Sequence, residues 1–129
     1  MRFLILVCFI CLGTVSSAQA ADDTDKRNMA NNLLHCYTAL AYWHQQFPPD
    51  DSPTLANLES SLEAFAGAAT ALYLMSGLTE ELAQERVELV LEKNWVEVQL
   101  FDRSQWTNTI FYCGSKLSSA KKLDEAASE

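Results

Sequence analysis

MANNLLHCYTALAYWHQQF, residues 29–47, is the stretch that decides the fold. Its apolar side chains recur at steps of four, three, four, three and four residues, which places them on one face of an α-helix. They are Met29, Leu33, Cys36, Leu40, Trp43 and Phe47. Because a helix with one apolar face must bury that face against other elements, the stretch predicts the first helix of a helical bundle.

Cys36 lies in the middle of this apolar face and has one counterpart far along the chain. The counterpart is Cys113, which lies on a similar apolar line. That line is Trp106, Ile110, Cys113 and Leu117. Cys8 and Cys11 lie in the N-terminal apolar run that we expect to be removed on export. Two lone cysteines that remain in an exported chain more often form a bridge than stay free thiols. We therefore predict a disulfide between Cys36 and Cys113, and a closed loop of this length contributes about 4 kcal/mol to stability in the chain-entropy model.

The first twenty residues have the pattern of a secretory signal peptide. Met1 and Arg2 form a short positive start, residues 3–12 are an unbroken apolar run, and residues 18–20 (Ala-Gln-Ala) offer small side chains for cleavage. The apolar run is too short to span a bilayer, which takes about 20 residues. We expect residues 1–20 to be removed on export, to a periplasm or out of the cell, with no stable membrane anchor left afterwards.

The charge balance is acidic and limits the choice of partner. The chain has 17 Asp and Glu against 9 Lys and Arg, a formal net charge of −8, and losing Arg2 with the leader would make it −9. Binding to nucleic acid or to an anionic membrane surface needs clustered Lys and Arg. The sequence has no such cluster, so it argues against both kinds of partner.

Caps and helix breakers divide the rest of the chain into helices joined by short turns. Residues 22–25 supply capping and acidic side chains for the start of the first helix, and residues 48–49, two prolines, end it. Ser52, followed by proline, caps a second helix that Gly77 terminates. Thr79 caps a third helix.

The boundary between the third and fourth helices has no glycine or proline. We place a turn at residues 102–104, with Ser104 capping the fourth helix; one continuous helix is the alternative. Residues 21–117 then form a single domain, and the polar residues 118–129 form a tail that we expect to fray. The predicted fold is all-α, an up-down-up-down four-helix bundle in which the first and last helices are antiparallel neighbours.

Small side chains dominate residues 64–71 of the second helix. Gly67 stands in the middle of this run, although a glycine inside a helix costs about 1 kcal/mol relative to alanine. We therefore expect Gly67 to mark the closest approach of another helix.

The predicted third helix carries two apolar lines roughly 145° apart around its axis. The main line is Ala83, Val87, Val90, Leu91, Val98 and Phe101, and the second line is Leu82, Leu89, Val96 and Leu100. Packing against two neighbouring helices would account for both lines. The sharper hypothesis makes the second line a seam for a partner protein or a second copy of the chain. A short strand over residues 96–100 is a third interpretation, less consistent with the surrounding helix formers.

Glutamates form a row beside the second apolar line. They are Glu81, Glu85, Glu88 and Glu92. Such a row is either a solvated face or a docking surface for a basic partner. Trp95 falls between this row and the main apolar line, and we expect it to be the most exposed tryptophan and the first candidate residue for contact with a partner. The leading hypothesis is an exported, non-enzymatic protein-binding or accessory module that uses this face of the third helix.

The sequence offers little for catalysis or metal binding. His35 and His44 are half a turn out of phase on one helix, so they point to opposite sides and cannot share a metal. No nucleophile has a histidine motif around it, and no phosphate-binding glycine loop occurs. We expect no enzyme activity, no metal and no cofactor.

A carrier of a small apolar ligand is the alternative function. In that interpretation the alanine-rich part of the second helix and the aromatic side chains of the first helix line a cavity inside the bundle.

Overall fold

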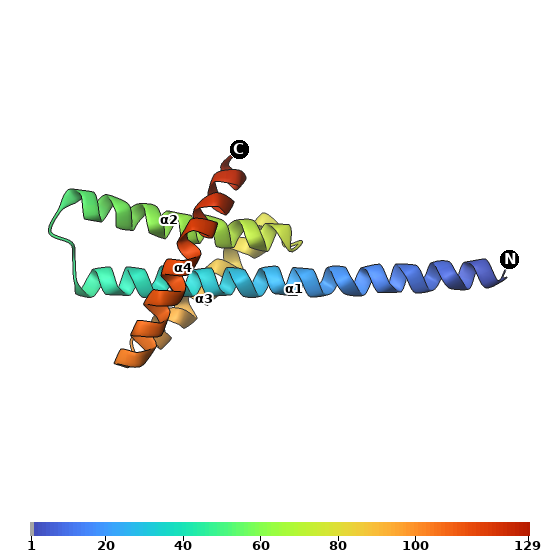
Figure 1. Ribbon diagram of the computed structural model, residues 1–129, viewed down its shortest axis with the longest axis horizontal. Helices are drawn as coiled ribbons and strands as arrows, with labels where there is room; N and C mark the ends of the chain where they lie inside the picture. The colour runs from blue at the N-terminus through green and yellow to red at the C-terminus, as the bar shows by residue number, and fades with distance from the viewer. Residues whose placement is uncertain (1) are drawn as a thin grey trace.

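The computed structural model describes the backbone of residues 2–129 and the side chains of residues 21–129. Its helices, in chain order, are α1 (Arg2–Gln46), α2 (Ser52–Met75), α3 (Glu80–Val98) and α4 (Arg103–Ser128) (Figure 1). No strand occurs in the part of the chain that is described. The predicted all-α fold with separate third and fourth helices is therefore confirmed.

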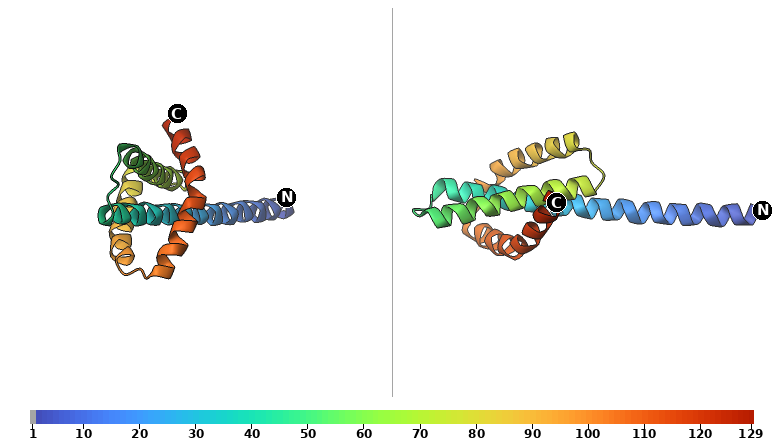
Figure 2. Two further views of the ribbon diagram at one scale, coloured as in Figure 1. Left: turned by 60° about the vertical axis from the view of Figure 1, so that its left-hand side comes forward. Right: turned by 90° about the horizontal axis from the view of Figure 1, so that it is seen from above.

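The antiparallel pair α1 and α2 forms the middle of the molecule (Figure 1). Seen from above in Figure 2, α3 lies on one side of this pair and α4 on the other. In Figure 1, α4 crosses α1 and α2 steeply, whereas we expected it to lie lengthwise along α1. The packing is that of a bundle in which α3 and α4 both run obliquely across the α1–α2 pair (Figure 2).

The disulfide between Cys36 and Cys113 is present and joins α1 to α4, as predicted, with the two Cα atoms 5.4 Å apart. Because α4 crosses α1, the bond lies where the two helices meet. This crossing covers only the middle of the apolar face of α1. Leu33 and Cys36 are buried, while Met29, Trp43 and Phe47 are exposed.

The helix termini differ from the predicted ones in three places. α1 does not begin near Asp22 but continues back to Arg2, and no proline or glycine stands between residues 14 and 47 to interrupt it. The N-cap of α2 is Asp51, one residue before Ser52, and its carboxylate accepts hydrogen bonds from the Thr54 amide (2.9 Å) and hydroxyl (2.7 Å).

The N-cap of α4 is Asp102 and not Ser104. The Asp102 carboxylate accepts from the Gln105 amide at 2.8 Å, and the Gln105 side chain accepts from the Asp102 amide at 2.9 Å. This reciprocal capping box satisfies two amides that a helix start leaves unpaired. The predicted end of α2 at Gly77 (φ +96°) and the cap of α3 at Thr79 are both found.

The predicted signal segment, residues 1–20, lies outside the residues whose side chains the structure describes. Its removal stays a prediction.

The core is built largely from small side chains. Its fully or almost fully buried members include Ala30, Leu34, Cys36, Ala64, Phe65, Ala68, Ala69, Leu72, Tyr73, Ala83 and Ala120. Alanine has a small side chain, so the backbones of α1, α2 and α4 approach closely where these core residues meet. The main apolar line of α3 is turned inward, with Ala83 and Val98 buried.

Gly67 lies where α4 presses on α2. An added Cβ at Gly67 would sit 2.6 Å from Cγ of Asp124 and would overlap its carboxylate. The expectation that Gly67 marks a close helix approach therefore holds for α4. Residues 118–129, which we expected to fray, are helical to Ser128, and Ala120 is completely buried.

Candidate functional site

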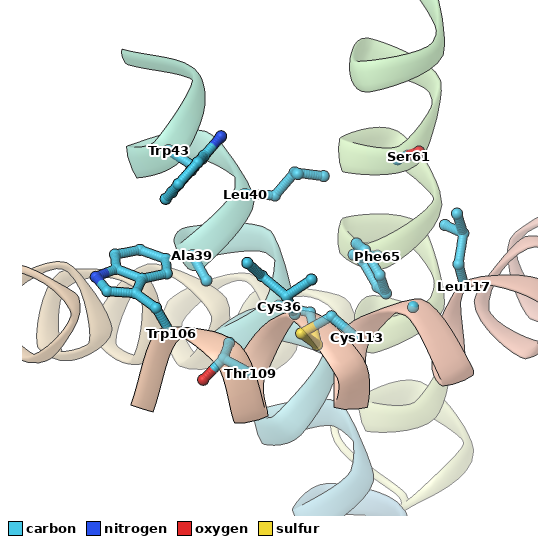
Figure 3. Close-up of a pocket in the computed structure, with 12 residues that line it drawn as sticks. Cys36, Ala39, Leu40, Trp43, Ser61, Phe65, Trp106, Thr109, Cys113 and Leu117 are labelled. Carbon is cyan, nitrogen blue, oxygen red and sulfur yellow. A yellow bond between two sulfur atoms is a disulfide. The ribbon is translucent and has the colours of Figure 1, made fainter. Parts of the chain in front are cut away.

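An apolar groove of about 380 Å³ lies between α1, α2 and α4. Its lining consists of Cys36, Ala39, Leu40, Trp43, Ser61, Phe65, Trp106, Thr109, Ile110, Cys113, Gly114 and Leu117. In Figure 3, Trp43 and Trp106 lie at one end, Phe65 and Leu117 at the other, and the disulfide lies between the two ends. No charged side chain lines the groove.

The groove differs from the cavity expected of a carrier. The alanine-rich part of α2 packs into the core, with Ala68 and Ala69 fully buried, and only Ser61 and Phe65 of α2 reach the groove. We did not predict from the sequence that α4 residues line the groove, because the apolar spacing does not indicate that α4 crosses α1. Trp106 lies on the same apolar line as Cys113, and this was the signal that could have assigned α4 residues to the lining.

Aromatic rings form a connected cluster at the end of the groove that contains the two tryptophans. Trp43 contacts Trp106 with ring centroids 5.7 Å apart, and Tyr42 stacks on Trp106 at 5.9 Å. Tyr42 also meets Trp95 edge to face at 5.5 Å. Phe101 packs against Trp106 at 5.2 Å and thereby ties the turn between α3 and α4 into the cluster.

Trp95 is consequently held by an aromatic neighbour, and it is not the most exposed tryptophan. Its exposed fraction is 37%, against 44% for Trp43. The expectation for Trp95 was wrong because α3 packs on α1, and this packing brings Trp95 against Tyr42. The more exposed Trp43 lies at the groove, beyond the point where α4 crosses α1.

The second apolar line is exposed; Leu82, Leu89 and Val96 lie on α3, and Leu100 lies in the turn that follows it. The exposed fractions are 49% for Leu82, 63% for Leu89, 61% for Val96 and 79% for Leu100. Packing against a second neighbouring helix does not account for the line, because no described residue covers it. The strand interpretation also fails, since α3 is helical to Val98 and a turn follows.

The glutamate row borders this exposed line on one side. Glu81, Glu85, Glu88 and Glu92 are all exposed, and within the described residues none of them forms an ion pair. The opposite border carries Arg86 and Lys93, and Lys93 lies 3.8 Å from Glu97. The acidic border is therefore left uncompensated by the chain's own cations.

The two histidines are far from forming a metal site. His35 packs against Phe101 with ring centroids 5.5 Å apart, and Nδ1 of His44 is buried without a hydrogen-bond partner. Among the described side chains, no group of three or more His, Cys, Asp or Glu comes together as a ligand set. A second hollow is lined by Asn32, His35, Asn108, Thr109 and Tyr112.

No protein-family model matches the chain, and no curated protein or solved structure matches it either. The molecule is defined by its own features as an all-helical bundle cross-linked by one disulfide. Within the described part of the chain, no helix combines the length and the apolar character needed to cross a bilayer. The disulfide is compatible with an exported protein.

Proposed function

We propose that the protein is an exported accessory module, periplasmic or secreted, that binds another protein through the exposed face of α3. The face consists of the apolar line and the glutamate row beside it. The observation that carries the proposal is the exposure of Leu82, Leu89 and Val96 on one line of α3, and of Leu100 in the turn that follows it. A folded protein leaves single apolar side chains exposed at many places, but exposed apolar side chains that recur every seven residues on one helix suit contact with a partner helix.

The charges beside the line indicate the chemistry of the partner. Four unpaired glutamates attract lysine and arginine and repel an acidic surface. We therefore propose a partner segment, such as an amphipathic helix, with an apolar stripe and with basic side chains on the side that faces the glutamate row. A second copy of this chain is disfavoured by its net charge of −8.

A designed peptide tests the proposal without knowledge of the natural partner. The probe is a helical peptide of about 20 residues with a leucine stripe and lysines beside it, labelled for fluorescence anisotropy. We expect binding to the wild-type protein that weakens as salt is raised, because salt screens the glutamates. A peptide with glutamate in place of lysine should bind at least about tenfold more weakly.

Leu89→Asp and Gln84→Asp form the matched pair of variants. Both positions are exposed on α3, but Gln84 lies off the apolar line. We expect Leu89→Asp to weaken peptide binding by about tenfold or more and Gln84→Asp to leave it nearly unchanged. Both variants should keep wild-type stability within about 0.5 kcal/mol, since neither removes a core contact. Equal binding by the two variants would contradict the proposal.

A further inference from the structure

The groove between α1, α2 and α4 supports an inference that is independent of the α3 face. Its walls come from three helices, and the Cys36–Cys113 disulfide holds two of those helices together at its floor (Figure 3). A covalent link at this point keeps the walls at a fixed separation. The groove is therefore a preformed site, as small-molecule sites usually are.

The volume of the groove limits what can occupy it. Its volume of about 380 Å³ lies near the lower end of the range for small-molecule sites, which is about 300 to 1,000 Å³. A small molecule is therefore the matching occupant.

The lining limits the chemistry of the occupant. It contains two tryptophans, one phenylalanine, three branched aliphatic side chains and the disulfide, with Ser61 and Thr109 as the polar members. The Ser61 hydroxyl already donates to the Asn57 carbonyl at 2.9 Å, so it offers a ligand only an acceptor. An ion placed here would lose water without gaining an opposite charge.

We propose that this groove binds one small, uncharged apolar molecule, of the size of a medium-length fatty alcohol or a two-ring hydrocarbon. The apolar part of the ligand lies between the tryptophans at one end and Phe65 and Leu117 at the other. Binding covers the exposed part of Trp43, which no other described element covers. The polar side-chain groups of the lining that can orient the ligand are the hydroxyls of Ser61 and Thr109 and the indole N–H groups of Trp43 and Trp106.

1-Decanol is a suitable probe, and the three tryptophans report on its position. Titration is followed by the indole N–H signals in NMR spectra of the full, disulfide-bonded chain. We expect the Trp43 and Trp106 signals to shift in a saturable way, because both rings line the groove. The Trp95 signal should shift least, because Trp95 does not line it.

Ser61→Phe and Ser60→Phe are the matched variants. Both replace a serine of α2 with the same bulky ring, but Ser61 lines the groove and Ser60 is exposed outside it. We expect Ser61→Phe to weaken 1-decanol binding by about tenfold or more and Ser60→Phe to change it by less than about twofold. Circular dichroism checks that both variants keep their helices.

Three outcomes would overturn the inference. They are the absence of a saturable shift, an equal loss of binding in the two serine variants, and shifts as large at Trp95 as at Trp43. Leu89→Asp separates this site from the proposed protein-binding face, because it should leave 1-decanol binding unchanged. A negative result for 1-decanol binding therefore does not count against peptide binding to α3, and the reverse also holds.

Discussion

Tyr73 makes the stability of the α1–α2 contact depend on pH. Its hydroxyl donates a hydrogen bond to Asn31, and burial raises the pKa of the phenol, although the positive charge of Arg86 acts in the opposite direction. Because the folded state favours the neutral phenol, the stabilisation is complete below the unfolded pKa of about 10 and is lost as pH rises through the folded pKa.

The variant Tyr73→Phe tests this dependence. At pH 8 we expect wild type to be more stable by about 1 kcal/mol, because it keeps the hydrogen bond to Asn31. The difference should shrink as the pH is raised beyond 10. Urea unfolding of both proteins across this range gives the comparison, and other titrating groups cancel between them. A difference that stays constant up to pH 11 would argue against the raised pKa.

Gly67 is a residue-scale test of the close contact between α2 and α4. We expect Gly67→Ala to lower the free energy of unfolding by about 1 kcal/mol, because the new methyl group displaces Asp124. Gly114→Ala is the control, since nothing lies within 4 Å of a Cβ added there, and it should stabilise the protein by up to about 1 kcal/mol. In an Asp124→Ala background, Gly67→Ala should stabilise as well. A penalty that persists in that background would place the clash elsewhere.

The start of α4 shows which helix termini can be predicted from local residue types. Ser104 has the right chemistry for a cap, but Asp102 takes the role because Gln105 stands three residues later and completes a capping box. The beginning of α3 at Thr79 and the end of α2 at Gly77 were predictable, since each depends on one local residue type. The exposure of Trp43 and Phe47 at the end of the apolar face of α1 was not predictable. These side chains are exposed because α4 crosses α1 and does not lie along it.

Cap replacement on α4 separates the two candidate residues. We expect Asp102→Ala to cost about 1 kcal/mol in the free energy of unfolding, because the Gln105 amide loses the carboxylate that accepts its hydrogen bond. Ser104→Ala should change it by less than about 0.5 kcal/mol, because Ser104 is exposed and does not cap the helix. Thermal or urea denaturation of both variants decides between them. A larger loss for Ser104→Ala would contradict the observed cap.

For the molecule as a whole, the sequence predicts the composition of the core better than the geometry of the packing. Apolar spacing identified the helices and the pairing of Cys36 with Cys113, because a helical period states which side chains face inward. It does not state the angle at which helices cross. The crossing angle depends on close contacts such as that of Gly67 with Asp124, and on the burial of Ala120. The groove between α1, α2 and α4 is a consequence of this angle.

The disulfide should account for a large part of the stability of the whole molecule. Replacing both Cys36 and Cys113 by alanine removes the only covalent cross-link among the described residues, which closes a sequence separation of 77 residues. We expect a loss of about 2 to 5 kcal/mol in the free energy of unfolding, measured in urea. A reduced wild-type sample should show a similar loss. A change below about 1 kcal/mol would mean that helix packing alone fixes α4 across α1.

Site-specific photo-crosslinking in the source cells tests the central claim, that α3 presents a protein-binding face, most directly. A photoreactive side chain replaces Leu89 on the exposed apolar line in one variant and Gln84 off the line in the other. The account predicts adducts with a distinct protein from position 89 that are absent from position 84 and that become fewer when Glu85 and Glu92 are changed to glutamine. Equal adducts at both positions, or none at position 89, would contradict it.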